Sequence, residues 1–249
     1  MKRYFIYLSY NGEKYCGWQI QPNGMSVQEA IETALATLLR VHTPIVGAGR
    51  TDAGVHARKM VAHFDNEKDY LDLDLLAKKL NSLLPRDIAI HKVLEVHPQA
   101  HARFDAISRL YRYYITTRKD PFLHHLKYKV YGDLDLDAMQ SCADVLFEYE
   151  DFTSFSKLHT DVKTNNCTIM QARWERQDGD YIFTIKANRF LRNMVRSVVG
   201  TLLEAGRGKI DVYGMRHIIE AKDRGAAGTS VPGHALFLED IEYDNSILG

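Results

Sequence analysis

Segments patterned as strand, helix and strand follow one another in both halves of the chain. In the first half, strands are predicted over residues 3–10, 45–48, 60–64 and 88–96, and helices over 26–38 and 72–84. In the second half, strands are predicted over 108–117, 169–174, 181–187 and 235–243, and helices over 136–147, 190–204 and 211–221. The segment from Gln99 to Asp105 lacks periodicity and marks the boundary. This order predicts two α+β halves, residues 1–104 and 105–249, with their sheets side by side and a cleft where they meet.

Local signals predict several helix ends. Ser26 and Glu29 form a capping box, in which each side chain satisfies a backbone amide at the start of a helix. Gly206 is the residue type that ends a helix such as the one over 190–204, and Asp211 is expected to cap the last helix. These signals are independent of the apolar periodicity and agree with it.

Composition excludes several classes of protein. Hydrophobic residues make up 45% of the 249 positions and charged residues 26%, which are the values of an ordinary globular protein. No apolar run reaches membrane-spanning length, and the N-terminus enters a strand without a signal peptide. The three cysteines are odd in number and far apart, which favours reduced thiols and argues against structural zinc. We therefore expect a soluble cytoplasmic protein.

Charge is balanced overall but uneven along the chain. The 32 basic and 32 acidic residues give zero net charge, which is not typical of a protein that coats nucleic acid without specificity. Basic residues gather between Arg103 and Arg118 and between Arg189 and Lys209. Such clusters are compatible with one basic groove or with separate solvated faces, and composition leaves both open.

A loop rich in Gly and Ala lies between the strands predicted over 45–48 and 60–64, with the sequence Gly49-Arg50-Thr51-Asp52-Ala53-Gly54-Val55-His56-Ala57. Its small residues let the backbone turn tightly and let another molecule approach closely. Asp52 lies in the middle of the loop, two residues from Arg50. An ionised carboxylate held there can act as a nucleophile, a general base or a metal ligand. The alternative is a turn in which Asp52 bonds its own backbone amides and Arg50 is solvated.

Tyrosines alternate with other residues along the strand predicted over 108–117. Tyr111 and Tyr113 should face one side of this strand, and Arg112 and Tyr114 the other. Tyrosine is common in half-buried strands, so the alternation by itself favours a core role. Aromatic rings beside arginines are also what stacks on an extruded base.

Three arginines, Arg189, Arg192 and Arg196, lie three and four residues apart. On the helix predicted over 190–204, Arg192 and Arg196 should share one face. A solvated stripe is the usual meaning of such spacing. Arg196, however, is flanked by apolar residues, so it is expected to be partly buried and to need an anion.

No pattern in the chain predicts a metal or a cofactor. The pairs His56 and His63, and His97 and His101, have no flanking carboxylates, and most such histidines are structural or on the surface. The sequence contains no phosphate-cradling Gly-rich motif of the Walker or Rossmann type. We expect neither group.

The loop around Asp52 resembles the catalytic motif of the tRNA pseudouridine synthase A family. A contiguous match of this length is far more specific than a lone Gly-rich pattern, and the resemblance extends over nearly the whole chain. Three further stretches carry it: 15–22 (Tyr-Cys-Gly-Trp-Gln-Ile-Gln-Pro), Phe104 to Tyr113, and Phe190 to Lys209.

The resemblance implies the pseudouridine synthase fold, with two similar halves around a central mixed, mainly antiparallel sheet. It implies that Asp52 is the catalytic nucleophile and that Tyr111 stacks on the target uracil, with its hydroxyl a candidate base. Arg196 is expected to form a salt bridge to Asp52, and Arg50 and Leu236 to bind the substrate.

One segment departs from the family pattern. Residues 227–236 stand where the family has an Ala-Gly-Pro-Thr-Ala-Pro-Pro loop followed by Gly-Leu. Ala227, Gly228, Pro232 and Leu236 match it. The other compared positions differ: Thr229, Ser230, Val231, Gly233 and Ala235. The sequence therefore does not determine the backbone path that leads to Leu236.

The implied activity is the isomerisation of uridine to pseudouridine at positions 38, 39 and 40 of the tRNA anticodon arm, by a homodimer without cofactor or metal. Two other functions are considered. A noncatalytic RNA-binding module would gain little from a carboxylate at position 52 in the path of an anionic ligand. A hydrolase acting on a nucleoside or glycoside would normally need a second catalytic carboxylate, and none is obvious in the loop.

Overall fold

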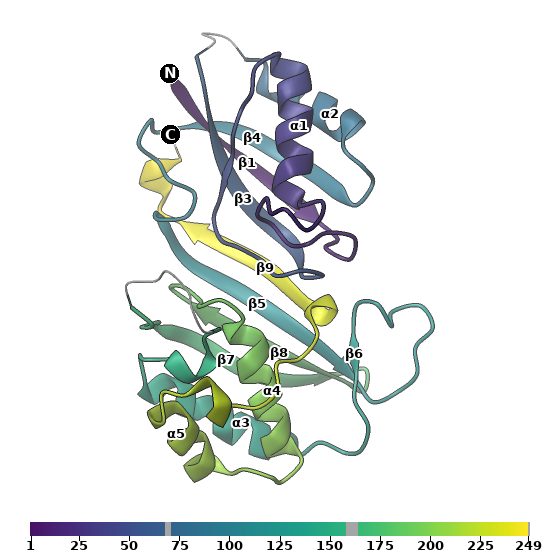
Figure 1. Ribbon diagram of the computed structural model, residues 1–249, viewed down its shortest axis with the longest axis vertical. Coiled ribbons are helices and arrows are strands. Elements are labelled where there is room, and N and C mark those ends of the chain that lie inside the picture. Colours follow the sequence, from purple (N-terminus) through teal and green to yellow (C-terminus); the bar gives the residue numbers. More distant parts are fainter. Residues whose placement is uncertain (68–70, 158–163, 249) are drawn as a thin grey trace. The chain divides into compact units, whose positions relative to one another are not determined.

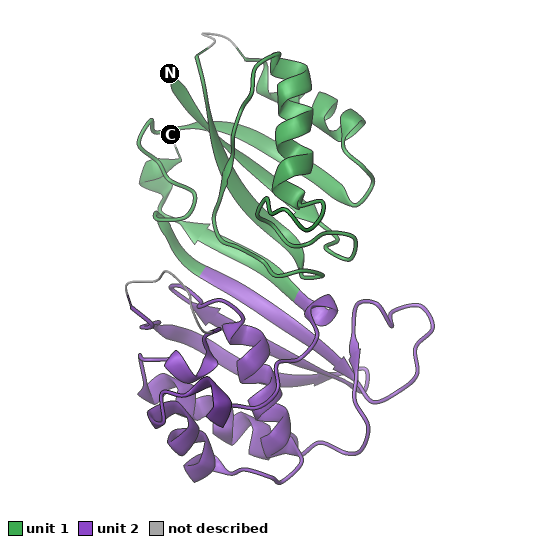
Figure 2. Ribbon diagram, viewed as in Figure 1, with its two compact units in different colours: residues 1–108, 237–249 green, residues 109–236 purple. Residues whose placement is uncertain are grey.

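A computed structural model describes residues 1–67, 71–157 and 164–248 (Figure 1). The chain divides into two compact units, coloured separately in Figure 2. Unit 1 consists of residues 1–108 and 237–249, and unit 2 of residues 109–236. The end of the chain thus belongs to the unit that contains its beginning, and the predicted boundary at 104/105 lies shortly before the first crossing.

Unit 1 is a sheet with two helices. Its central strand β1 pairs antiparallel with β3 on one side and β4 on the other, and β3 also pairs antiparallel with β2 and parallel with β9. The strand order is β4-β1-β3-β9. These elements are β1 (Lys2–Tyr10), β2 (Val46–Gly47), β3 (His56–Asn66), β4 (Ile88–Val96), β9 (Leu236–Tyr243, whose first residue lies in unit 2), α1 (Val27–Leu39) and α2 (Leu73–Leu83).

The start of α1 confirms Ser26 as the cap, which is one half of the predicted capping box. The Ser26 hydroxyl accepts a hydrogen bond from the Glu29 amide at 3.1 Å. Val27, Ile31 and Leu35 are fully buried, so one side of the helix packs against the rest of unit 1. Cap and apolar stripe together explain why the helix begins where it does.

Unit 2 consists, in its described residues, of β-strands and three α-helices. Strand β8 lies between β5 and β7 and pairs antiparallel with both, and the short β6 pairs parallel with β5. The elements are β5 (Ala106–Thr116, whose first three residues lie in unit 1), β6 (Tyr128–Lys129), β7 (Ile169–Gln177), β8 (Asp180–Ala187), α3 (Leu136–Asp144), α4 (Met194–Gly206) and α5 (Val212–Glu220). The predicted α+β class with a mixed, mainly antiparallel sheet is confirmed.

One helix start was predicted wrongly. Helix α4 begins at Met194 rather than near Phe190, because Asn193 has the left-handed backbone conformation (φ 67°) and cannot continue a helix backwards. The carbonyl of Arg192 instead accepts a hydrogen bond from the Lys157 amide at 3.0 Å. The prediction that Arg192 and Arg196 share a helix face is therefore wrong.

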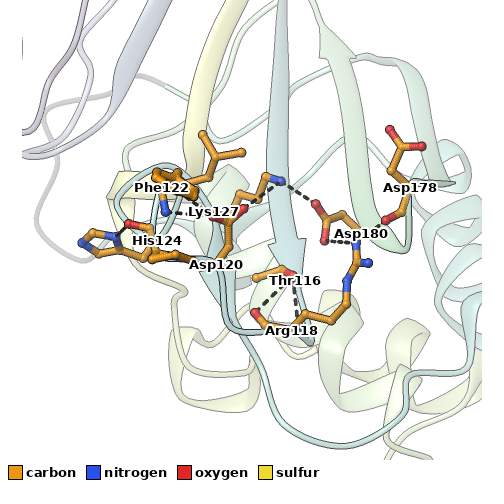
Figure 3. A network of polar contacts seen from close by, with 10 residues as sticks. Thr116, Arg118, Asp120, Phe122, His124, Lys127, Asp178 and Asp180 are labelled. Atoms are coloured by element: carbon orange, nitrogen blue, oxygen red, sulfur yellow. Dashed lines mark hydrogen bonds and ion pairs between the residues drawn. The ribbon is translucent and has the colours of Figure 1, made fainter.

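The connection from β5 to β6 is an irregular loop fixed by charged side chains (Figure 3). The Lys127 ammonium lies 2.6 Å from the carboxylate of Asp180, at the start of β8. The Arg118 guanidinium lies 3.7 Å from the same carboxylate and also donates to the Asp178 carbonyl. Asp120 accepts from the next amides of the loop. The shared carboxylate of Asp180 thus ties this loop to the turn between β7 and β8.

In the described parts of the chain, we find no helix whose length and apolar character would suit a membrane span.

Ionisable side chains in unit 1 support the connection between β4 and β5. The Arg3 guanidinium binds both carboxylate oxygens of Asp65, at 2.7 and 2.8 Å, and donates to the Ala100 carbonyl at 3.0 Å. Nδ1 of His63 accepts from the Ala102 amide at 3.1 Å. Burial, together with the positive charge of Arg3, lowers the pKa of His63 to about 4. His63 is therefore neutral at pH 7 and can act as an acceptor.

We predict that acid destabilises unit 1 through His63. An unfolded histidine takes up a proton near pH 6.5, whereas folded His63 does so only near pH 4. The free energy of unfolding should therefore fall as the pH drops through this window and should not depend on this group above it. His63→Asn keeps an acceptor oxygen near the position of Nδ1 but does not titrate. Urea denaturation between pH 7 and 4 should give a shallower decline for this variant, and parallel curves would contradict the assignment.

Candidate functional site

The Asp52 loop is a tight turn between β2 and β3. The Val55 amide donates to the Asp52 carbonyl at 3.1 Å, and Gly54 has a positive φ of 76°. Asp52 is half-buried, Arg50 is exposed and Thr51 is buried. The turn is thus closed by a hydrogen bond between the backbone groups of Asp52 and Val55.

The backbone of Gly17 lies against the middle of this loop. A methyl group at position 17 would overlap the Thr51 carbonyl oxygen and come within 3.1 Å of the Asp52 carbonyl carbon. Gly17 also has φ +100°, a conformation that side chains rarely adopt. The next residue, Trp18, donates its amide to the Thr51 carbonyl at 3.1 Å, and the Thr51 hydroxyl lies 2.8 Å from that of Tyr10. The carbonyl and the hydroxyl of Thr51, directly before Asp52, are therefore both held.

The other end of the loop is held by the residues that follow β1. A Cβ atom on Gly12 would overlap the Val55 carbonyl, and the Gly12 amide donates to Nδ1 of His56 at 3.0 Å. His56 is 1% exposed, and its ring stacks on that of Phe237 with centroids 4.5 Å apart. The Gly54 amide donates to the Tyr15 carbonyl at 3.4 Å. Residues 12–18 thus contact the Asp52 loop from Thr51 to His56.

Helix α1 fixes this supporting segment in turn. The Val27 amide donates to the Gly17 carbonyl at 3.2 Å, and the Gln28 amide to the Trp18 carbonyl at 3.0 Å. These are amides of the first helical turn, which have no partner inside the helix. From the next turn, the buried Glu32 accepts the Ile45 amide at 2.9 Å. One helix therefore positions both the support and the segment that leads into the Asp52 loop.

In unit 2, Tyr111 and Tyr113 lie on the same side of β5, as the alternation predicted. Tyr111 is 9% exposed, and its ring meets that of Phe190 edge to face, with centroids 5.3 Å apart. Tyr113 is fully buried and donates its hydroxyl to the Pro232 carbonyl at 2.8 Å. Burial raises the pKa of Tyr113 far above its usual value. Tyr113 is therefore a core residue.

Arg196 lies on α4, half-buried, and is bound to the loop that departs from the family pattern. Its Nε donates to the Val231 carbonyl at 2.7 Å, and its own carbonyl accepts from the Val231 amide at 3.2 Å. This reciprocal pair fixes the first part of the guanidinium. It also places Val231 in the backbone path that leads to Leu236, which is buried and begins β9.

The same loop packs closely on α4. A methyl group at Gly200 would overlap the Thr229 carbonyl, and the Gly228 amide donates to the Thr201 hydroxyl at 2.9 Å. The Ser230 hydroxyl receives hydrogen bonds from Asn193 at 2.6 Å and from Arg224 at 2.8 Å. The loop is therefore well anchored although several of its residues differ from the family pattern.

The predicted site residues fall into two groups. Arg50 and Asp52 belong to unit 1, whereas Tyr111, Arg196 and Leu236 belong to unit 2. The salt bridge between Asp52 and Arg196 stays a prediction. Sequence reasoning missed Gly12 and did not assign a role to Gly17, because their importance depends on contacts with a segment far along the chain. Among the described residues, no three His, Cys, Asp or Glu side chains are grouped so as to hold a metal ion.

The Gly49–Ala57 loop and the segment 15–22 that contacts it are two of the stretches on which the family resemblance rests. The family model for tRNA pseudouridine synthase matches residues 6–105 and 149–244, so the chain belongs to that family. Among its relatives, "tRNA pseudouridine synthase A" of Parabacteroides distasonis is 64% identical over 247 residues, which cover 99% of this chain and 98% of that protein. The protein of the same name from Bacillus subtilis is 40% identical over 242 residues, covering 96% and 98%.

We predict that Gly17→Ala destabilises the protein more than a matched glycine substitution. Gly132 also has a positive φ (84°) but is exposed, and a methyl group there would meet nothing within 4 Å. Gly132→Ala should cost about 1–2 kcal/mol, the cost of a left-handed alanine. Gly17→Ala should cost more, because the Thr51–Asp52 peptide must also move. Urea denaturation at pH 7 measures both, and equal losses would show that the close approach is not a constraint.

Proposed function

We propose that this protein isomerises uridine to pseudouridine in tRNA, at positions 38, 39 and 40 of the anticodon arm. The observation that carries the proposal is the complete Gly49–Ala57 motif, held in place by residues 12–18 in a chain that belongs to the tRNA pseudouridine synthase family. The expected partner is tRNA, bound by a homodimer in the cytoplasm.

The reaction is balanced within the substrate. The bond from the sugar to the uracil ring nitrogen breaks, the uracil rotates, and a ring carbon forms the new bond to the sugar. That carbon loses a proton and the ring nitrogen gains one, so the product is an isomer. Neither an oxidant nor water is consumed. A uracil stacked in a stem is out of reach, so the target nucleotide must first flip out of the helix.

Asp52 is the proposed nucleophile, attacking either the sugar or the ring. The backbone contacts around it serve this role, because a nucleophile must be held within reach of one atom while the uracil turns. Arg50, exposed on the same loop, is proposed to occupy the position of the departed base and to hold the flipped state. Leu236 is proposed to line the uracil pocket.

Tyr111 and Arg196 are proposed to complete the site. The edge-to-face contact with Phe190 orients the Tyr111 ring, which we propose stacks on the flipped uracil. Arg196 is proposed to form a salt bridge with Asp52. Its Nε bond to Val231 supports this role, because a guanidinium held at one nitrogen loses little further freedom when it binds a carboxylate.

Asp52→Asn is expected to abolish pseudouridine formation while leaving folding and tRNA binding intact. Losing a covalent catalyst should raise the barrier by several kcal/mol, so less than about a thousandth of the wild-type rate should remain. Pseudouridine is read by chemical derivatisation of tRNA, and binding by filter retention. Asp74→Asn, on the exposed first turn of α2, is the control and should be fully active. Residual turnover above that level would exclude Asp52 as the nucleophile.

Substitutions of Tyr111 separate stacking from proton transfer. Tyr111→Leu should weaken tRNA binding by roughly ten- to a hundredfold, since stacking of a base on an aromatic ring is worth about 1–3 kcal/mol. Tyr111→Phe should bind normally and turn over slowly if the hydroxyl moves the proton. Tyr114→Phe, on the opposite side of β5, is the control for the loss of a hydroxyl from this strand.

The three measurements are melting temperature, affinity and turnover on the same preparations. A fully active Tyr111→Phe would remove the proton role and leave stacking. If both Tyr111 variants only lower the melting temperature, Tyr111 is a core residue without a role in the reaction.

A further inference from the structure

The connection between β4 and β5 presents a large apolar side chain to solvent. Phe104 is 72% exposed, and the adjacent Arg103 is exposed as well. Single exposed apolar residues are common on protein surfaces and need no explanation by themselves. Phe104 differs because the backbone that carries it is held by many directed contacts, although it belongs to neither a helix nor a strand.

His101 forms the first of these supports. Its Nδ1 accepts hydrogen bonds from the amides of Arg103 at 3.1 Å and of Phe104 at 3.3 Å. The His101 amide donates to the Asp105 carboxylate at 2.7 Å, and the Asp105 amide donates to the His101 carbonyl at 3.1 Å. The chain from 101 to 105 is therefore closed on itself at both ends.

Side chains from the sheet of unit 1 form the second support. Beside the His63 contact to the Ala102 amide, the Tyr243 hydroxyl donates to the Ala102 carbonyl at 2.6 Å. Both backbone groups of Ala102 are thus bound by side chains of β3 and β9. A loop fixed in this way loses little conformational entropy when a ligand binds to it.

Three neighbouring aromatic rings lie in a row that ends at Phe104: His63 of β3, then His101 and Phe104 of the loop. The centroids of His63 and His101 are 4.6 Å apart, and those of His101 and Phe104 are 4.2 Å apart. The guanidinium carbon of Arg103 lies 5.6 Å from the centroid of Phe104. Burial and the charge of Arg3 lower the pKa of His101, which favours the neutral ring that its acceptor role requires. Phe104 is therefore an exposed phenyl ring that contacts the His101 ring and has the Arg103 guanidinium over it.

We propose that Phe104 and Arg103 form a stacking site for an unpaired nucleobase of the bound tRNA, in addition to the residues proposed for the reaction. The inference rests on the proposed function for the identity of the ligand. A phenyl ring stacks on any base because every base has a π-face, and an arginine beside it attracts the phosphate backbone. Phe104 has no hydrogen-bonding group, so the site should add affinity without choosing a base.

Phe147 provides a matched control. It is a second exposed phenylalanine, at 51%, but Glu148, Glu150 and Asp151 follow it closely in sequence. The carboxylates of Glu148 and Asp151 form ion pairs with Arg216 and Lys222, so the cations of this surface are already engaged and we expect it to bind RNA less strongly than the surface at Phe104. The same substitutions at positions 104 and 147 therefore separate nucleobase stacking from general effects of changing an exposed ring.

Tryptophan substitutions report stacking directly. The native Trp18 and Trp174 are 3% and 5% exposed, so a tryptophan at position 104 should dominate the solvent-sensitive fluorescence. Titration of Phe104→Trp with unmodified tRNA should quench this emission, whereas Phe147→Trp should not respond. An anticodon stem-loop and a fully paired duplex of equal length test the need for an unpaired base, and only the stem-loop should quench.

Leucine substitutions measure the contribution to binding. Phe104→Leu should weaken tRNA affinity by about five- to a hundredfold, in line with one stacked base, and Phe147→Leu by less than twofold. Because Phe104 is exposed, its replacement should leave the melting temperature unchanged. Equal affinities for Phe104→Leu and wild type, or equal quenching at the two positions, would overturn the proposal. So would a loss confined to self-association, measured by sedimentation, since Phe104 would then contact a second copy of the chain.

The outcome also separates this inference from the proposed function. Pseudouridine formation by the wild type is measured alongside binding. If the wild type modifies tRNA and Phe104→Leu binds tRNA normally, the stacking site is refuted and the proposed activity stands. A wild type that binds tRNA through Phe104 but forms no pseudouridine would leave the stacking site and refute the proposed activity.

Discussion

The position of Asp52 depends on a steric contact between two backbone segments. Gly17 lies so close to the Thr51–Asp52 peptide that no side chain fits between them. The Gly17 carbonyl accepts a hydrogen bond from an amide in the first turn of α1. Helix α1 is in turn held by the burial of Val27 and Ile31. The apolar packing of α1 thus holds its first turn, the first turn holds Gly17, and Gly17 lies against the peptide that precedes Asp52. A substitution in any of these segments should therefore displace Asp52 although Asp52 itself is unchanged.

Unit 2 uses backbone contacts in a similar way, and this explains how its divergent loop keeps its path. The Val231 amide and carbonyl both bind Arg196, and the Thr229 carbonyl lies against Gly200. Backbone groups are the same whatever the side chain, so Thr229 and Val231 can differ from the family pattern while these contacts persist. Ser230, in contrast, binds through its side chain, to Asn193 and Arg224. Its hydroxyl is the kind of group that threonine, the family residue at this position, also carries.

The local features were predictable from the sequence, whereas the contacts between distant segments were not. The caps at Ser26 and Asp211 and the alternation along β5 follow from neighbouring residues, and each is confirmed. Helix α4 begins later than predicted because Asn193 has a left-handed backbone conformation, which the apolar periodicity does not indicate. The support of the Asp52 loop by Gly12 links residues more than forty positions apart, and a single sequence contains no signal for such a pairing. Motif resemblance identified the loop; only the structure explains why it is rigid.

Imidazole side chains help to hold two loops of unit 1, the Asp52 loop and the 101–105 loop. Nδ1 of His56 accepts the Gly12 amide beside the Asp52 loop, and Nδ1 of His63 and His101 accepts amides of the 101–105 loop. A ring nitrogen accepts a hydrogen bond only when it carries no proton. Each of these contacts therefore requires the neutral tautomer that is protonated at Nε2. Amide and carboxylate side chains could also accept, as the Asp105 carboxylate does from the His101 amide, but neither carries an aromatic ring. A neutral ring instead supplies an acceptor and a stacking face together, and in the 101–105 loop both are used.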